Sequence, residues 1–327
     1  MSDDLFTSDV RFAPYWWERT PRPVLVPRDV PPTCDVAIVG SGYTGLQAAL
    51  QTARGGRHTV VFDAEDAGFG CSTRNGGQIS TSVKPSLATL TKRHGEQRAT
   101  AIVREGQRSL AWTGEFIRAE GIDCDFRVCG RFHAAHNAAQ FEALAKKATQ
   151  QPKGLEVEAH VVPRAEQHRE IGTDAYFGGV VYAQHASVDP ARYHQGILER
   201  VTAAGATLVA HCPVTAIARD GGRYRVTTAR GTTSARDVVI ATDGYTGPLS
   251  PWLQRRVIPI GSYVIATEPL PEAIVERLMP RNRIVSDTRK VVFYYRTSPD
   301  RRRILFGGRV SVSETDPRNS APLLHAD

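Results

Sequence analysis

The chain has 327 residues, of which 41% are hydrophobic and 23% are charged, and its formal net charge is +7. This composition excludes a disordered chain and is typical of a globular protein, and the length favours two domains. The longest apolar runs have the size of strands, so no membrane span is predicted.

Three features of the sequence indicate which partners the protein binds and where it is located. They are the distribution of charge, the first residues and the cysteines. Basic residues are spread along the chain, and their densest cluster, Arg301–Arg303, lies at an expected hairpin tip where charge is solvated. No basic stripe interleaved with aromatic residues is present, so no nucleic-acid partner is predicted. The first residues lack a basic region followed by an apolar core, and the five cysteines are scattered without metal-ligand spacing. We therefore predict free thiols, no bound metal and a cytoplasmic location.

The first segment, residues 1–32, contains six prolines and is expected to be an extended arm. Its aromatic cluster, Tyr15-Trp16-Trp17, would form a sticky patch if it were exposed to solvent. We therefore expect these aromatic side chains to pack on the body of the protein.

An apolar strand, Cys34–Val39, runs directly into a G-x-G-x-x-G turn and a helix. In such a turn, Gly40 permits a sharp bend, Gly42 lets the backbone approach a pyrophosphate, and Gly45 lets the helix pack closely on the strand. A second apolar run ends in Asp63, at the spacing typical of an acid that binds ribose hydroxyls. Strand, turn, helix, strand and acid in this order predict one dinucleotide-binding βαβ unit, for NAD or for FAD.

A second glycine-rich stretch, Gly68–Gln78, follows with one arginine and several small hydroxyl residues. Such a loop is suited to placing backbone N–H groups against an anion or a planar ring. A plain NAD-binding unit would continue into its third strand at this point. The alternative interpretation is a flexible surface turn.

Helices and strands alternate in the next part of the chain. Residues Ser86–Glu120 are predicted to be helical, with breaks at Gly95 and Gly106. Residues Phe126–Ala134 are predicted to form a strand or a hairpin, and Asn137 is expected to cap the helix that follows.

The chain is then predicted to return to the nucleotide-binding unit. Asp189 as N-cap and Pro190 in the first turn start a helix that Gly205 stops, and the strand Ala206–Ala210 follows at once. Helix followed by strand is the order that a return to a parallel sheet requires. Two hairpins come next, and the second ends in Asp237–Gly244, a buried type of strand whose small residues would let a bound dinucleotide lie close.

After this strand the chain is predicted to leave the nucleotide-binding unit a second time. Val257–Glu268 and Lys290–Arg309 are rich in strand formers, with a turn at Ser298–Asp300. The predicted organisation is an N-terminal arm (1–32), a dinucleotide-binding domain (33–80 and 187–247) and a discontinuous substrate domain (81–186 and 248–327).

Several stretches together resemble the glycine/D-amino-acid oxidase (DAO) family of FAD-dependent oxidoreductases, and most closely its gamma-glutamylputrescine and sarcosine oxidoreductase branch. The resemblance covers nearly the whole chain and is most specific at Gly68–Gln78. It rests on Tyr15–Trp17, Gly40–Gly45, Gly68–Gln78, Asp237–Thr246, Ile265–Leu270 and Ile304–Arg309. It implies FAD as cofactor and an α/β fold, in which a Rossmann-like FAD-binding domain is joined to a discontinuous α+β substrate domain with a mixed or antiparallel sheet.

The chain departs from that branch in three ways. Asp63 stands where the branch usually has Glu, and Cys71 stands where it usually has Ala. Members of the branch also continue well beyond the point that matches the last residues of this chain. The resemblance is therefore to a copy that lacks the closing C-terminal segment.

The resemblance also implies which residues contact the cofactor. The expected FAD-binding residues are Gly40, Ser41, Gly42, Tyr43, Thr44, Gly45, Asp63, Ala64, Ser72, Arg74, Asn75, Gly76, Gly77, Gln78, Val214, Ala241, Thr242 and Gly244. Among them, Val214 would give its backbone to the adenine edge.

The chemistry expected of such a protein is oxidation of a C–N bond in a small amine or amino acid. Hydride would pass from the carbon next to nitrogen to flavin N5, the imine would be hydrolysed, and oxygen or another electron acceptor would take the electrons. No strong acid–base catalyst is demanded, so no catalytic residue is predicted. The expected substrate wall consists of Tyr263, Tyr294, Arg296 and Arg309, with an arginine as a bidentate clamp for a carboxylate. Strand alternation puts Tyr294 and Arg296 on one face and Tyr295 on the other.

Two histidines and one cysteine have a structural interpretation. His133 and His136 have no carboxylate partner nearby in the sequence, so a structural role is favoured over a metal site. Cys71 lies in the expected flavin loop, and a small buried residue is favoured over a covalent flavin attachment.

Two other functions remain open at the level of sequence. A flavin monooxygenase or a reductase fed by NAD(P)H commonly has a second nucleotide fingerprint, and the sequence holds no second G-x-G-x-x-G. The other alternative is an inactive fragment, or one that binds FAD weakly, with exposed sheet edges.

Overall fold

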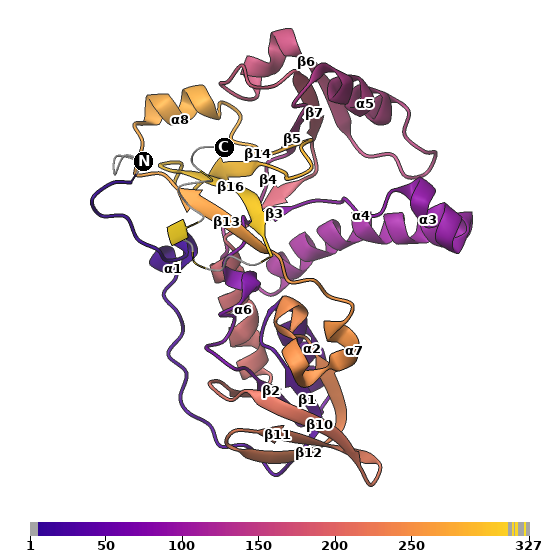
Figure 1. Ribbon diagram of the computed structural model, residues 1–327, viewed down its shortest axis with the longest axis vertical. Helices are drawn as coiled ribbons and strands as arrows, with labels where there is room; N and C mark the ends of the chain where they lie inside the picture. The colour runs from indigo at the N-terminus through magenta and orange to yellow at the C-terminus, as the bar shows by residue number, and fades with distance from the viewer. Residues whose placement is uncertain (1–5, 313–315, 317, 320–323, 325–327) are drawn as a thin grey trace.

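Two β-sheets, one above the other in Figure 1, organise the chain. The structure is a computed structural model that describes residues 6–312, 316, 318, 319 and 324. The lower sheet has six strands, and the upper sheet has seven. This mixed α/β architecture confirms the fold class predicted from the sequence.

The lower sheet combines a parallel half with an antiparallel meander. The strands β12, β1, β2 and β9 pair in parallel, and β10, β11 and β12 pair antiparallel. Their order across the sheet is β10 (Val214–Asp220), β11 (Arg223–Thr228), β12 (Gly231–Ile240), β1 (Thr33–Val39), β2 (Thr59–Phe62) and β9 (Thr207–Val209). The predicted βαβ unit is therefore present, and the later segment returns to its sheet.

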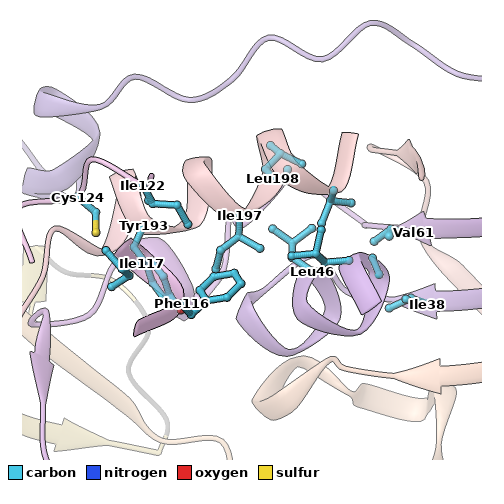
Figure 2. Packing of buried hydrophobic residues seen from close by; sticks show 14 of the residues in the cluster. Ile38, Leu46, Val61, Phe116, Ile117, Ile122, Cys124, Tyr193, Ile197 and Leu198 are labelled. Carbon is cyan, nitrogen blue, oxygen red and sulfur yellow. The ribbon is translucent and has the colours of Figure 1, made fainter. Parts of the chain in front are cut away.

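Two helices cover one face of this sheet and bury its core. They are α2 (Tyr43–Arg54) and α6 (Pro190–Ala203), which pack on each other. Leu46 of α2 lies between the strand residues Ile38 and Val61 and the α6 residue Ile197, as Figure 2 shows. Full burial of each such side chain contributes roughly 1.5–3 kcal/mol. The cluster thus fixes both helices on the strands whose ends carry the glycine turn.

The upper sheet is mixed, with one parallel pair among its described strands, β14 with β5. Its strands in order are β13 (Gly261–Ala266), β16 (Ile304–Ser311), β15 (Tyr294–Thr297), β14 (Ile284–Asp287), β5 (Arg131–Ala134), β7 (Gly178–Tyr182) and β6 (Ala159–Pro163). A small third sheet joins β3 (Gln78–Ile79), β8 (Ala186–Ser187) and β4 (Arg127–Val128). The strands of the lower sheet come from 33–80 and 187–247, whereas the domain boundaries themselves stay a prediction.

The remaining helices are short, apart from α4 and α5. The α-helices are α1 (Tyr15–Arg19), α3 (Leu87–His94), α4 (Glu96–Ala119), α5 (Ala138–Thr149), α7 (Pro251–Gln254) and α8 (Glu272–Leu278). The 3-10 helices are η2 (Cys71–Thr73), η3 (Arg164–Arg169), η4 (Asp243–Tyr245) and η5 (Gly247–Leu249). Within the described part of the chain, no helix combines the length and the apolar character needed to cross a membrane.

The predicted helix signals hold in the structure. The Asn137 side chain accepts from the Gln140 N–H (2.9 Å) at the start of α5. The Asp189 side chain accepts from the Ala191 and Arg192 N–H groups (3.0 and 3.1 Å) at the start of α6. These local caps were readable in the sequence because each needs only residues within one helical turn.

The structure corrects one local expectation and decides between the two alternatives of another. Gly95, with φ +79°, does separate α3 from α4, but α4 continues through Gly106. A Cβ at Gly106 would lie 2.2 Å from Val83 Cγ2, so this glycine permits a close contact and does not end the helix. For Phe126–Ala134, predicted as a strand or a hairpin, the strand alternative is confirmed, because β4 pairs with β8 while β5 pairs with β7 and β14.

Gly196, in the middle of α6, gives a test of the core. We expect Gly196→Ala to destabilise the fold by about 1–3 kcal/mol, although alanine favours a helix by about 1 kcal/mol, because its Cβ would lie 2.3 Å from Ile122 Cγ2. The measurement is the free energy of unfolding in urea. Adding Ile122→Ala should make the double variant more stable than the sum of the single changes, and exposed Thr202→Ala is the control, expected within about 0.5 kcal/mol. A Gly196→Ala protein as stable as wild type would contradict this packing.

Candidate functional site

The turn between β1 and α2 is built from main-chain atoms in direct contact. Gly40 has φ +99°, and a Cβ there would lie 2.5 Å from the carbonyl oxygen of Ala241. A Cβ at Gly45 would lie 1.9 Å from the carbonyl oxygen of Gly40. No other residue fits at either position without moving the backbone. The two glycines therefore allow β1, α2 and the end of β12 to lie in direct contact.

The N-terminus of α2 is suited to an anion. Gly42 is its N-cap and makes no side-chain cap, and the first turn has no acidic residue. The first N–H groups of a helix have no intrahelical acceptors, and the helix dipole is positive there. The Ser72 hydroxyl accepts from the Tyr43 N–H (3.0 Å), and Thr44 is exposed in the same turn. This end of the helix therefore fits a phosphate group.

Asp63, at the end of β2, is bound to the glycine turn. One carboxylate oxygen accepts from the Ser41 N–H (2.8 Å) and from the Ser41 hydroxyl, and the other accepts from the Glu65 N–H (3.0 Å). The Asp63 carbonyl oxygen accepts from the Cys212 N–H (2.8 Å), which brings the segment before Val214 beside it. The exposed Ala64 follows in the bend. The carboxylate thus stabilises the turn, and its ribose contact stays a prediction.

The loop Gly68–Gln78 lies directly against the glycine turn. The Gly68 N–H donates to the Ser41 hydroxyl oxygen (2.9 Å), and a Cβ at Gly42 would lie 2.9 Å from Ser72 Oγ. Within the loop, the Asn75 side-chain oxygen accepts from the Gly77 N–H (2.8 Å). Two segments separated in the sequence therefore share one site.

The third segment, after β12, completes the site. The Ala241 N–H donates to the Val39 carbonyl oxygen (2.8 Å), so β12 ends beside β1. The Thr242 hydroxyl bonds to the Thr246 hydroxyl (2.8 Å), and Gly244 lies in η4. The three segments that the sequence singled out thus meet at the glycine turn.

Arg74 faces solvent and aromatic rings. Its guanidinium lies 4.7 Å from the Phe69 ring centroid, and Nη2 donates to the Tyr245 hydroxyl (3.0 Å). Cys71 also approaches Tyr245, with Sγ 3.6 Å from the hydroxyl oxygen. Cys71 is exposed, so the expectation of a buried residue was wrong. Its side chain points out of the tight loop.

His194 is a residue of the site that the sequence reasoning missed. It is 1% exposed on α6, and Nε2 donates to the Ser41 carbonyl oxygen (2.7 Å). A Cβ at Gly68 would lie 2.3 Å from the same nitrogen. Burial lowers the pKa of His194 to about 4, so the ring is neutral at neutral pH. Its position inside the helix gave no signal, because its partner lies 153 residues away.

Arg296 of β15 has a different role from the predicted carboxylate clamp. Its Nη1 donates to the carbonyl oxygens of Gly77 (2.9 Å) and Val188 (2.8 Å), and its Nε donates to the Thr297 carbonyl oxygen (3.0 Å). Burial lowers the pKa of Arg296 to about 10, which still leaves it charged at neutral pH. The guanidinium therefore joins the loop to the upper sheet.

Strand alternation is confirmed for the neighbours of Arg296. Tyr295 packs in the core of the upper sheet, while the Tyr294 ring lies against the loop, 2.9 Å from where a Cβ at Gly76 would be. The Tyr294 hydroxyl bonds to the Ser262 hydroxyl (3.1 Å), and burial raises the pKa of Tyr294. Tyr294 therefore lies where the loop meets the upper sheet.

The other two members of the predicted wall do not join it in the described structure. Tyr263 pairs with Gly308, whereas Tyr294 pairs with Gly307. Directly paired residues share a face and neighbours along a strand alternate, so Tyr263 lies on the opposite face from Tyr294. The single wall was therefore wrong for Tyr263, and the side chain of Arg309 lies outside what the structure describes.

The two histidines of the β5 segment bind hydroxyl groups. His133 Nδ1 lies 3.0 Å from Ser286 Oγ, and His136 Nδ1 lies 2.7 Å from Thr288 Oγ1. Burial lowers the pKa of His133 to about 4. Among the described residues, no group of three or more His, Cys, Asp or Glu side chains could hold a metal ion.

His194 predicts a pH dependence of stability. Its folded pKa is lowered from 6.5 to about 4, so its contribution is complete above about pH 6.5 and is lost as the pH falls through about 4. The loss is on the order of 3 kcal/mol, and His133 and His185, whose pKa values are also lowered by burial, add to it. His194→Gln, whose amide keeps a donor for Ser41, should flatten the fall in unfolding free energy between about pH 7 and pH 4.5. Equal slopes for variant and wild type would contradict a neutral, buried His194.

Comparison with known sequences gives the same assignment over most of the chain. The sequence profile of the family described as DAO, FAD dependent oxidoreductase, matches residues 35–326. The chain is 32% identical over 289 residues to gamma-glutamylputrescine oxidoreductase of Escherichia coli (strain K12), which covers 87% of this chain and 66% of the relative. It is 31% identical over 311 residues to the probable oxidoreductase OrdL of Rhizobium meliloti (strain 1021), covering 93% and 71%. The chain thus spans about two thirds of the length of the curated relatives it matches.

Solved structures show the same fold at low sequence identity. Glycine oxidase from Geobacillus kaustophilus superposes with a TM-score of 0.69 at 18% identity, covering 86% of this chain and 72% of that one. L-amino acid deaminase from Proteus vulgaris superposes with a TM-score of 0.66 at 17% identity, covering 87% and 63%. The site geometry, the profile match and the sequence relatives agree, and the chain belongs to the DAO family of FAD-dependent oxidoreductases.

Proposed function

We propose that this chain binds FAD at the glycine turn and, with it, oxidises the C–N bond of a small amine or amino acid. The observation that carries the proposal is the convergence of the glycine turn, the loop Gly68–Gln78 and the end of β12 at the N-terminus of α2. The relatives add the substrate class, since their names refer to gamma-glutamylputrescine, glycine and L-amino acids.

The residues present fit the cofactor in charge and in space. The α2 N-terminus has no acid in its first turn and offers main-chain donors to a pyrophosphate. Because Gly42 has no side chain, the Ser72 hydroxyl lies against this turn, so a ligand there would meet both main-chain and hydroxyl groups. In this proposal Asp63 accepts from a ribose hydroxyl, Val214 gives its backbone to the adenine edge, and Ala241, Thr242 and Gly244 allow close passage.

The bound flavin supplies a hydride acceptor, which is the chemistry that the protein side chains lack. What the chain contributes is binding and orientation. The loop residues Ser72–Gln78 would lie along the ring system, and Tyr294, at the junction of loop and upper sheet, would border the substrate. Oxygen or another electron acceptor would take the electrons, and the predicted location is the cytoplasm.

Cofactor binding is tested by flavin titration of the purified chain. We expect wild type to bind FAD with one site, seen as quenching of flavin fluorescence. Asp63→Ala should weaken FAD binding at least about tenfold, because it removes an acceptor and loosens the Ser41 turn. The matched control is Asp66→Ala, a nearby acid whose carboxylate pairs with His211 and not with the turn. A wild-type chain that ignores FAD would refute the proposal in favour of a non-binding fragment.

The reaction class is tested by reducing the bound flavin without oxygen. At least one of the amines and amino acids tested, which include gamma-glutamylputrescine, glycine and proline, should bleach the colour of the oxidised flavin. NADPH alone should leave it unchanged. Bleaching by NADPH and by none of the amines would instead support a reductase or monooxygenase.

A further inference from the structure

The N-terminal aromatic residues are bonded to the loop of the candidate site. Trp16 is 2% exposed, and its Nε1 donates to the Asn75 carbonyl oxygen (2.7 Å). Trp17 Nε1 donates to the Thr73 hydroxyl oxygen (2.9 Å), and the Thr73 hydroxyl donates to the Gly68 carbonyl oxygen (2.8 Å). Two adjacent indoles of α1 therefore hold the loop at Thr73 and at Asn75.

Trp16 also lies where the two sheets and the loop meet. It packs with Ala191 of α6 and Leu305 of β16. The Arg296 guanidinium, which binds the Gly77 carbonyl oxygen, lies 5.6 Å from the Trp16 ring centroid. Trp16 and Arg296 thus hold the loop at neighbouring positions, and each stabilises the placement of the other.

Trp17 is enclosed by residues at the start of the same loop. The Phe69 ring centroid lies 5.8 Å from that of Trp17, and the guanidinium groups of Arg22 and Arg74 lie 5.2 and 5.7 Å from it. Arg22, from the arm, donates to the Ala67 carbonyl oxygen just before the loop. The arm therefore contacts the chain from Ala67, just before the loop, to Asn75 within it.

The part of the arm that touches the loop is also bonded to α6. Arg19 bonds to Asp189, the N-cap of α6, at 3.4 Å and to Asp125 at 3.2 Å. Farther along, Val24 is fully exposed and Val26 is 74% exposed. Leu25, between these two valines, packs on the core of the lower sheet, so a partly exposed segment joins the loop-contacting residues to that sheet.

We propose that α1 is a positioning clamp for the loop Gly68–Gln78, with the Trp16 and Trp17 N–H groups as its operative atoms. A glycine-rich loop has many accessible conformations, and holding it in one conformation before the ligand arrives lowers the entropy cost of binding. The clamp rests on the proposed function in that its ligand is FAD. It acts on the protein alone as well, since it orders the loop whether or not FAD is bound.

The first experiment measures the loop without cofactor. Hydrogen exchange of the backbone amides of residues 68–78 should be at least about tenfold faster in Trp16→Phe and in Trp17→Phe than in wild type, because phenylalanine keeps an apolar ring but donates no hydrogen bond. Trp252→Phe, at a 57% exposed position in α7, is the matched control and should exchange as wild type does. Unchanged exchange in both α1 variants would overturn the clamp. This result does not depend on FAD.

The second experiment measures the effect on the ligand. Trp16→Phe and Trp17→Phe should each weaken FAD binding by about tenfold and alter the absorption spectrum of the bound flavin, while Trp252→Phe changes neither. Coupling is reciprocal, so FAD should slow exchange in residues 14–20 of wild type. A wild-type chain without FAD affinity would refute the proposed function, whereas wild-type affinity and spectrum in both variants would refute the clamp's action on the cofactor.

Two controls distinguish a general loss of folding from a specific loss of the indole N–H groups. Thermal unfolding of the cofactor-free variants should keep a single transition, because the ring of phenylalanine still fills the space between Ala191 and Leu305. Trp16→Ala, which also removes the ring, should lower Tm further than Trp16→Phe but weaken FAD about equally. If Trp16→Ala binds FAD weakly but Trp16→Phe binds it as tightly as wild type, packing of the ring alone matters. That result would overturn the role of the N–H group.

Discussion

Contact between main-chain atoms at the glycine turn is the constraint on which the rest of the structure depends. The Gly40 carbonyl oxygen lies where a Cβ of Gly45 would be, and the Ala241 carbonyl oxygen lies where a Cβ of Gly40 would be. A single methyl group at either position would separate helix from strand or β12 from β1. Since β1, α2 and β12 meet at the start of α2, the same contacts that pack the lower sheet also form the proposed site for a phosphate.

The loop Gly68–Gln78 connects this turn with the N-terminal arm and the upper sheet. Ser72 binds the start of α2, the α1 indoles bind Thr73 and Asn75, and Arg296 binds Gly77. A glycine-rich segment has little structure of its own, so bonds from outside determine its shape. The lower sheet, the arm and the upper sheet therefore meet at one loop, and a change in any of them alters the candidate site.

Two buried polar side chains at this meeting point have main-chain partners. His194 is kept neutral by burial and donates to Ser41, and the charged Arg296 is compensated by three carbonyl oxygens. Leaving such groups unpaired would cost far more than their bonds contribute, so they favour a single arrangement of the backbone around them. This is why side chains without a part in the expected chemistry still govern the geometry of the site.

The sequence by itself determined the features that need only neighbouring residues. These are the strand–turn–helix at Cys34–Gly45, the caps Asn137 and Asp189, and the hairpin of β15 and β16. Tertiary structure alone decided that Gly95 ends a helix whereas Gly106 allows a close contact within one. It also decided that Tyr263 and Tyr294 lie on opposite faces and that Arg296 donates to a carbonyl oxygen of the loop. Turns and caps are set by energies within a few residues, whereas register, faces and side-chain partners depend on chain segments up to 219 residues apart, which no local pattern encodes.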